Sequence, residues 1–340
     1  MTDLSRFKLG LGTMSPEIVD LCLEYSAVNN YPIMLIASRN QADVDSGYAF
    51  TTPTLSEHIR NNPNYDPNRV LVCRDHGGPY FSDLDQGESL QHATGRCVET
   101  IINDAELGFD LIHIDVSKIN PEEQDRVATT LFNVALTVNP NLMFEFGCED
   151  NTGEILKENL DSMRAQMSFL EHFEPQVKFF VSQTGSLTKH RQVGKFNNVI
   201  ARISTDMAHG KGLLFKEHNA DYLSHSHIVQ RKLAGIDAMN IAPQLGCIQT
   251  QVMHDLGKEL GAVYDDFRAL VLAKGNWARW VTPNVTDAQT KFIAGGHYSF
   301  NSIQGIALKA ALGDSLTSHL KPAIFTVLDE YKSGMEYIPE

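Results

Sequence analysis

The stretch VLVCRDHG, residues 70–77, carries the pattern that decides the fold of this chain. A short apolar run leads into charged and polar residues, and an amphipathic segment of helical length, LQHATGRCVETIINDAELG, follows at 90–108. A strand that is almost wholly apolar is buried on both faces, as in a parallel sheet covered by helices. The pattern therefore predicts a strand, a polar turn and a crossover helix.

The same unit recurs along the chain. The other strand candidates are KLGLGTM (8–14), PIMLIAS (32–38), LIHIDVS (111–117), LMFEFGCE (142–149), VKFFVSQTG (177–185), LLFKEHNAD (213–221) and DAMNIAPQLG (237–246). Eight such units in about 250 residues match a (βα)8 TIM barrel. The competing architecture is an open doubly wound sheet. We favour the barrel because the count reaches eight and no GxGxxG opens the first unit.

The segment from about 262 to 340 does not repeat the unit and has the pattern of several helices. We expect a mostly helical C-terminal extension that caps the barrel or extends an interface. No low-complexity linker precedes it, so we expect residues 1–340 to form a single domain. Trp277 and Trp280 are expected to be packing or interface residues.

Composition excludes several classes of protein. The chain has 340 residues, 42% of them hydrophobic, and a net charge of -14 from 42 acidic and 28 basic residues. A nucleic-acid or membrane-surface binder normally has a basic face, so we expect neither partner. No apolar run approaches the roughly 20 residues of a membrane span. The five scattered cysteines, without CxxC spacing, and an N-terminus without a signal-peptide core indicate a cytoplasmic protein.

Polar residues gather at the predicted carboxyl ends of the strands, where barrel enzymes place their sites. The sharpest signal is Asp75-His76-Gly77-Gly78-Pro79. A strand-end histidine can bind a metal while the adjacent carboxylate transfers a proton, and glycines let backbone approach a ligand. The alternative is an ordinary tight turn with a solvated aspartate.

Glu217-His218 repeats the acid–imidazole pair on the seventh strand. His76, His218 and one carboxylate would form an open divalent-metal site, unless one histidine only forms hydrogen bonds at the rim. Glu149 is the expected third ligand or a base, and Glu217 is a further catalytic candidate. Glu145 lies inside an apolar strand and needs a partner, either a metal or a salt bridge.

Further polar residues suit a polyol substrate. His113 and Asp115 either hold substrate hydroxyls or a ligand, or form a polar layer inside the barrel. The other substrate-binding candidates, each of which alone would be an ordinary cap or turn residue, are Ser38, Asn40, Gln41, Gln183 and Asn240.

At these strand ends the chain resembles the accessory (Z-type, "non-catalytic") subunit family of class II D-tagatose-1,6-bisphosphate aldolase. The order and spacing of the matching stretches cover about residues 30–250. These stretches are SRNQADVDSGYAFTTP (38–53), VCRDHGGPYF (72–81), GFDLIHIDVS (108–117), FGCEDNTGE (146–154), VSQTGSLTKH (181–190), FKEHNADY (215–222) and NIAPQLG (240–246).

That group is itself similar to catalytic class II fructose- and tagatose-bisphosphate aldolases, which are (βα)8 barrels with a histidine-bound zinc. The resemblance implies that Asp75 is the proton-transferring aspartate, that His76 and His218 are zinc ligands, and that Asn240 contacts substrate. Some members are sugar epimerases, and retro-aldol cleavage followed by re-addition would connect the two activities.

Two departures from the catalytic family bear on function. The zinc histidine after the sixth strand is missing from SQTGS, where Gln183 lies, so a third ligand would come from Glu149, Glu145 or Gln183. The glycine-rich phosphate cradle is replaced by Asn219-Ala220-Asp221, and Asp221 would repel a phosphate.

The sequence therefore predicts an enzyme that depends on a divalent metal, with zinc the expected ion, and that acts on a ketose or ketose phosphate as an aldolase or C4-epimerase. The alternative is a non-catalytic subunit that stabilises a partner tagatose-bisphosphate aldolase. We expect a homo-oligomer, or a heteromer with a class II aldolase, and a small-molecule sugar or sugar phosphate as ligand.

Overall fold

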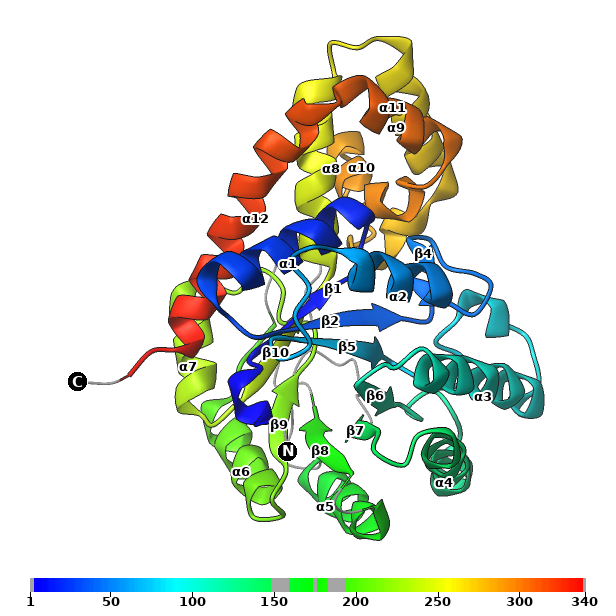
Figure 1. Ribbon diagram of the computed structural model, residues 1–340, viewed down its shortest axis with the longest axis vertical. Helices are drawn as coiled ribbons and strands as arrows, with labels where there is room; N and C mark the ends of the chain where they lie inside the picture. The colour runs from blue at the N-terminus through cyan, green and yellow to red at the C-terminus, as the bar shows by residue number, and fades with distance from the viewer. Residues whose placement is uncertain (1–2, 148–158, 174–175, 183–193, 339–340) are drawn as a thin grey trace.

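The computed structural model describes residues 3–147, 159–173, 176–182 and 194–338. Its centre is a closed barrel of parallel strands in the order β1-β10-β9-β8-β7-β6-β5-β2 (Figure 1). The pairing closes through β1, which is parallel to both β10 and β2. The predicted (βα)8 barrel is therefore confirmed, and the open sheet is excluded because an open sheet would leave two edge strands.

The barrel strands are short and follow the predicted runs. They are β1 (Leu9–Gly12), β2 (Ile33–Ser38), β5 (Val70–Asp75), β6 (Leu111–Ile114), β7 (Met143–Phe146), β8 (Val177–Val181), β9 (Leu214–Glu217) and β10 (Ala238–Ile241). A small parallel pair, β3 (Ala42–Asp43) and β4 (Phe50–Thr51), follows β2. The surrounding helices are α1 (Pro16–Asn29), α2 (Thr52–Asn61), α3 (Leu90–Glu106), α4 (Pro121–Val138), α5 (Asn159–Leu170), α6 (Asn198–His209), α7 (His225–Leu233) and α8 (Pro243–Gly257).

Helix starts are set by local chemistry. The Ser15 side chain accepts a hydrogen bond from the Ile18 amide, and Pro16 occupies the first turn of α1, where its missing N–H costs nothing. Pro243 occupies the same position in α8. The strand predicted over 237–246 therefore ends at Ile241, and Gln244 lies in the first turn of a helix instead of at a strand end.

The barrel interior changes from apolar to polar along the strands. Its amino-terminal half is filled by a cluster that includes Met34, Ile36, Leu71, Cys73, Leu111, Phe179 and Ala238. Two residues beyond Leu111 stands His113, and two beyond Ala238 stands Asn240, both buried. Because strand side chains alternate, residues two apart face the same side. The polar residues therefore continue the interior column toward the carboxyl ends.

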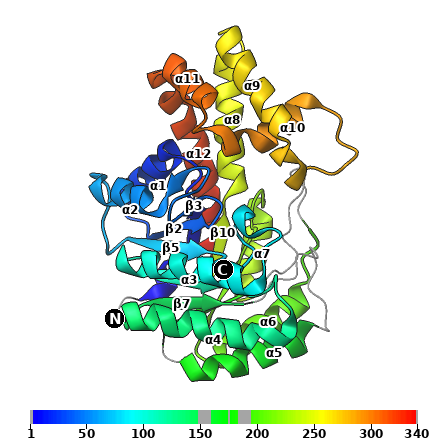
Figure 2. The same ribbon diagram turned by 90° about the vertical axis from the view of Figure 1, so that its right-hand side faces the viewer.

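The C-terminal extension is helical, as predicted, and consists mainly of α9 (Ala262–Lys274), α10 (Ala288–Gly295), α11 (Ile303–Leu312) and α12 (Asp314–Met335). The shorter helices gather beside α8 around an apolar cluster that includes Met253, Phe267 and Phe292. From there α12 runs back along α8 to α7 (Figure 1, Figure 2). The assignment of the whole chain to one domain stays a prediction.

Among the helices of the described ranges, none has the length and apolar character that a bilayer crossing needs.

Candidate active site

The alternation of side chains along each strand decides which of them point into the barrel. On β9, Lys216 reaches across the interior, and its Nζ lies 2.8 Å from Oε2 of Glu145 on β7. The next residue, Glu217, faces outward and pairs with Arg231 of α7 at 2.8 Å. His218, one residue further, faces inward again. Alternation thus places Lys216 and His218 in the interior and removes Glu217 from it.

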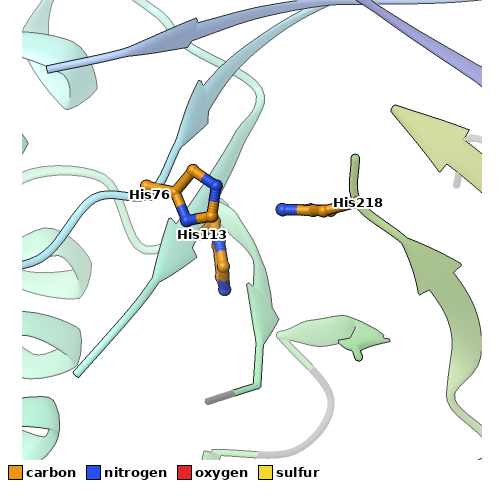
Figure 3. A group of neighbouring side chains, drawn as sticks. All are labelled: His76, His113 and His218. Carbon is orange, nitrogen blue, oxygen red and sulfur yellow. The ribbon is translucent and has the colours of Figure 1, made fainter. Parts of the chain in front are cut away.

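Three imidazoles meet at the carboxyl end of the barrel (Figure 3). His76 follows β5, His113 lies in β6 and His218 follows β9. The ring centroids are 5.4 Å apart for His76 and His113, 5.1 Å for His76 and His218, and 4.9 Å for His113 and His218. One ring nitrogen from each lies within 4.8 Å of the others. Residues far apart in the chain therefore form one compact nitrogen cluster.

His76 is held in place by its backbone and by a carboxylate. Its φ of 47° is in the left-handed region, which is uncommon for a non-glycine residue and concentrates at functional sites. Its Nδ1 lies 2.7 Å from Oδ2 of Asp115, and its ring stacks on Phe81 at 5.0 Å. Burial raises the pKa of Asp115, but the bond to His76 and the nearby imidazoles outweigh it and hold that pKa below its ordinary value. An ionised Asp115 accepts the Nδ1 proton, so Nε2 of His76 keeps its lone pair for a ligand.

His113 is fixed in the complementary tautomer. Its Nε2 lies 3.2 Å from the carbonyl oxygen of Gly147, and a carbonyl can only accept, so Nε2 carries the proton. Burial lowers the pKa of His113 to about 4, which keeps the ring neutral at pH 7. Its Nδ1 is buried and has no hydrogen-bond partner among the described residues. That lone pair is the one available to a metal.

Asp75 lies beside the imidazoles. Its Oδ1 is 3.3 Å from Nδ1 of His218 and 3.4 Å from Nδ2 of Asn240. Burial raises the pKa of Asp75, but His76 and His218 outweigh it, so the pKa lies below its ordinary value. Gly10 makes room for Asn240, because a Cβ on Gly10 would lie 2.0 Å from Oδ1 of Asn240. Asp75 is thus an ionised carboxylate able to accept a proton.

The sequence leaves open whether Glu145 pairs with a metal or forms a salt bridge. The structure shows a salt bridge and also places Glu145 near a candidate metal ligand. Its Oε2 pairs with Lys216, and its Oε1 lies 3.7 Å from Nε2 of His218. Burial raises the pKa of Glu145, but Lys216 outweighs it and keeps the pKa well below the usual range. Oε1 has no hydrogen-bond partner within the described part of the chain. Glu145 is therefore a charged group beside the histidine cluster.

Gly77 and Gly78, which follow His76, pack closely against the backbone of β6 and of the residue after it. A Cβ on Gly78 would lie 1.5 Å from the carbonyl oxygen of Asp115, and one on Gly77 would lie 2.7 Å from that of His113. The Gly77 amide donates to the His113 carbonyl at 2.8 Å. Close approach of these glycines to a ligand stays a prediction, and the structure gives them a second reason. They let the loop that carries His76 pack against the backbone that carries His113 and Asp115.

The donor set fits a divalent cation that accepts nitrogen ligands. Buried polar atoms normally have partners, yet Nδ1 of His113 and Oε1 of Glu145 have none among the described residues. A cation held by His76, His113 and His218 would satisfy the first of these atoms, and a carboxylate lies within reach as a further ligand. Three imidazoles with an open position are a donor set that zinc accepts in catalytic sites.

The structure places the other predicted residues in different surroundings. Ser38 ends β2 opposite Asp75 in register. The side-chain amide of Gln41 is buried. Its oxygen accepts a hydrogen bond from the backbone N–H of Ser38, and its nitrogen donates to the Met14 sulfur. Asn40 pairs with Asp83 on the loop after β5. Substrate contacts by Ser38, Asn40, Gln41 and Asn240 stay predictions.

For two predicted site residues the structure gives no position, and a third lies away from the cluster. Glu149 and Gln183 lie outside the described residues. Glu217 is fully buried against Arg231 on the outer face of β9, which corrects the expectation that it is a catalytic residue. The sequence leaves His113 open between a substrate or ligand contact and a polar layer inside the barrel, and the structure shows it beside the two predicted metal ligands. The alternation of His113 with Asp115 was the available signal.

No model of a known protein family matches the chain. Among solved structures, a probable tagatose 6 phosphate kinase from Sinorhizobium meliloti 1021 is similar, with a TM-score of 0.80 and 16% identity, covering 97% of this chain and 100% of that chain. The fructose-bisphosphate aldolase of Campylobacter jejuni has a TM-score of 0.57 and 12% identity, covering 96% of this chain and 90% of that chain. At these identities the likeness shows a shared fold, which is consistent with the resemblance described above.

Proposed function

We propose that the chain is a divalent-metal-dependent enzyme that acts on a ketose or ketose phosphate by aldol chemistry, as an aldolase or a C4-epimerase. The observation that supports the proposal is the cluster of His76, His113 and His218 with Asp75 beside it. A metal-binding imidazole cluster next to an ionised carboxylate is suited to polarising a carbonyl and moving a proton.

His76, His113 and His218 would hold the cation. When bound, it would supply a Lewis acid for the ketose carbonyl, and zinc is the ion we expect. Asp115 and the Gly147 carbonyl orient the first two rings, which is the usual role of groups behind metal ligands.

Asp75 is the proposed proton carrier. It takes the proton of the C4 hydroxyl as the C3–C4 bond breaks, and the bonding electrons pass to C3 as the enediolate of the three-carbon ketone. The C4 carbon leaves as an aldehyde. If the aldehyde rotates and presents the opposite face of its carbonyl before the C3–C4 bond forms again, the product is the C4 epimer. Asp75 then returns the proton to the C4 oxygen. Asn240 would bind a substrate hydroxyl through its Oδ1, which has no hydrogen-bond partner among the described residues.

Relationship to the tagatose-bisphosphate aldolase accessory family belongs to the same proposal. The kinase activity named for the S. meliloti protein is not part of the proposal, because at 16% identity the likeness shows the fold alone. A cytoplasmic location and a homo-oligomer, or a heteromer with a class II aldolase, stay predictions from the sequence.

The alternative function is a non-catalytic subunit that stabilises a partner aldolase. The missing histidine after the sixth strand favoured this alternative. His113 offers a third imidazole from β6, next to His76 and His218, and so supports the enzyme. Co-purification with a candidate aldolase, and no turnover by the isolated chain, would favour the subunit.

The direct test combines metal analysis with turnover. Purified wild-type protein is expected to hold about one divalent ion per chain and to interconvert C4-epimeric ketoses or ketose phosphates, or to cleave them, as followed by NMR. Chelation should abolish turnover and added zinc should restore it. His113→Ala and His76→Ala should both lose the ion.

His92→Ala is the matched control, because His92 is an exposed histidine paired with Glu88 on the surface. It should keep both metal and turnover. Wild-type protein that holds no metal, or that turns over equally well after chelation, contradicts the proposal. Metal retained by His113→Ala would return His113 to a substrate-binding role.

A further inference from the structure

We propose that the cavity between the loop after β9, the start of α8 and the C-terminal extension binds an uncharged, hydroxyl-bearing end of the substrate and excludes phosphate. The inference rests on the proposed function, because it assigns the substrate class of the same site. It also gives the extension a role in binding.

The cavity has a volume of about 500 Å³, within the usual range of small-molecule sites. Asn219, Asp221 and Tyr222 line it from the loop after β9, and Pro243 lines it from α8. The extension contributes a wall that includes Trp280, Gln289 and Ile293. The cavity therefore has both apolar and hydrogen-bonding walls, as sites for small polar molecules do.

The cavity and the histidine cluster lie at the ends of the same two strands, β9 and β10, although no residue of the cluster is among the described residues that line the cavity. β9 leads into His218 and then directly into Asn219. β10 supplies Asn240 to the cluster, and Pro243 follows shortly after it in the cavity wall. The Ala220 amide donates to the Asn240 carbonyl at 2.9 Å, which ties the two strand ends together. In the proposal, a substrate held at the cluster extends past these two strand ends into the cavity.

Asp221 occupies the position at which a phosphate would bind. In (βα)8 barrels, phosphate commonly binds at helix amides beside the last strands, because those N–H groups lack partners within the helix. Here Oδ1 of Asp221 already accepts from the Ala242 amide at 3.1 Å and from the Gln244 amide at 2.8 Å. The carboxyl group is buried and comes from the protein itself, so a phosphate would have to displace it.

The charges lining the cavity also disfavour phosphate. Its lining includes Asp221 and Asp287, and no lysine, arginine or histidine among the described residues. Burial raises the pKa of Asp221 to about 7, so that group is only partly ionised at neutral pH, whereas Asp287 is ionised. A phosphate ester carries between one and two negative charges at pH 7 and binds where cations or unused amides face it. The described lining holds no cationic side chain, and the Ala242 and Gln244 amides are already bonded to Asp221. Hydroxyl groups, in contrast, can bond to amide side chains such as those of Asn219 and Gln289.

The loop that shapes the cavity is held in an unusual conformation. Asn219 and Tyr222 have φ values of 55° and 59°, so two non-glycine residues of one short loop are left-handed. Tyr331 of α12 stabilises the loop, because its hydroxyl donates to the Ala220 carbonyl and accepts from the Leu223 amide. Such strain persists only where the surroundings enforce it, and it concentrates at binding sites.

Trp280 provides the reporter for a test. The chain has two tryptophans, so Trp277→Phe leaves Trp280, in the cavity wall, as the sole emitter. Fluorescence of this variant is titrated with dihydroxyacetone and with dihydroxyacetone phosphate, a pair that differs only in the phosphate group. We expect the uncharged ketone to bind at least about tenfold more tightly, with and without added zinc.

A gain-of-function variant tests the role of Asp221. Asp221→Ala frees the Ala242 and Gln244 amides, so inorganic phosphate should raise the melting temperature of this variant by a few degrees. It should leave wild type and the exposed control Asp45→Ala unchanged. If Asp221→Ala does not fold, Asp221→Asn replaces it. The asparagine oxygen still accepts from the two amides, so this variant should still reject the phosphate ester.

Two outcomes overturn the inference. The first is a wild-type protein that binds the phosphate ester as tightly as the free ketone. The second is a folded Asp221→Ala variant without a response to phosphate, or an Asp221→Asn variant that binds the ester. Failure of the proposed function is seen separately, as an absence of metal-dependent turnover, because the Trp280 signal is read with and without metal.

Discussion

Nδ1 of His76 and Oδ2 of Asp115 lie 2.7 Å apart, and this contact sets the direction of the His76 ring toward the other imidazoles. Because Asp115 accepts the Nδ1 proton, the nitrogen without a proton is Nε2, which is the atom that the proposed function assigns to the cation. The loop after β5 and the loop after β6 are thus coupled through one hydrogen bond between side chains.

Asp115→Asn is therefore expected to weaken metal binding by about 10- to 100-fold without unfolding the protein. The amide keeps the shape of the side chain but removes the charge that fixes the His76 tautomer. Competition with a coloured chelator measures the affinity. Asp110→Asn, near the other end of β6, is the control and should bind metal like wild type. Equal affinity in the Asp115 variant would show that the contact is not needed to orient His76.

Two glycines should respond in opposite ways to alanine. Gly78→Ala would place a Cβ 1.5 Å from the backbone oxygen of Asp115, and no side-chain rotation can relieve that overlap. We expect a loss of about 3 kcal/mol or more in the free energy of unfolding. Gly95 lies within α3 with nothing within 4 Å of its Cβ position, so Gly95→Ala should gain about 0.5–1 kcal/mol. Urea denaturation of the two variants measures both, and a neutral Gly78→Ala would contradict the close packing.

The buried pair of Glu217 and Arg231 is expected to be structural. Arg231→Met alone would leave the Glu217 carboxylate buried without its guanidinium and should cost about 3–5 kcal/mol. The double variant Glu217→Leu/Arg231→Met should recover most of that loss. Glu217→Gln should hold as much metal as wild type, because the side chain faces α7. Metal loss in a folded Glu217→Gln protein would place this residue in the site after all.

His297 should make the stability of the fold sensitive to acid. Burial lowers the pKa of His297 to about 3, with a smaller contribution from Arg279, and neither ring nitrogen has a hydrogen-bond partner among the described residues. The folded state therefore holds a neutral ring, whereas the unfolded chain takes up a proton near pH 6.5. The contribution of His297 to the free energy of unfolding is fully present above about pH 6.5 and decreases as the pH drops toward 3. At pH 4 the loss is about 3 kcal/mol.

His297→Phe removes this titration while keeping an aromatic ring against Tyr48 and Tyr298. Unfolding by urea at a series of pH values should show a flatter acid limb for this variant than for wild type. His92→Gln, at an exposed position, should follow wild type. Superimposable acid limbs for wild type and His297→Phe would contradict the prediction.

The repeated apolar runs determined the fold from the sequence alone. Burial on both faces of a parallel strand leaves a local signature, and the count of eight units is visible without any tertiary information. The same local chemistry predicted the helical extension. The end of the last strand was misplaced because Pro243 starts a helix there, and an apolar run does not distinguish strand from helix at its boundary.

The site was determined partly by sequence and partly by tertiary structure. The sequence placed His76 and His218 at strand ends, and the structure brings their ring centroids to 5.1 Å. The outward direction of Glu217 could also be predicted, because it alternates along β9 with the inward-facing Lys216 and His218. The role of His113 needed the closed barrel, because the direction of its free nitrogen depends on the Gly147 carbonyl of the neighbouring strand. Local sequence fixes which face of a strand a side chain occupies, but only closure of the barrel decides which side chains from different strands meet there.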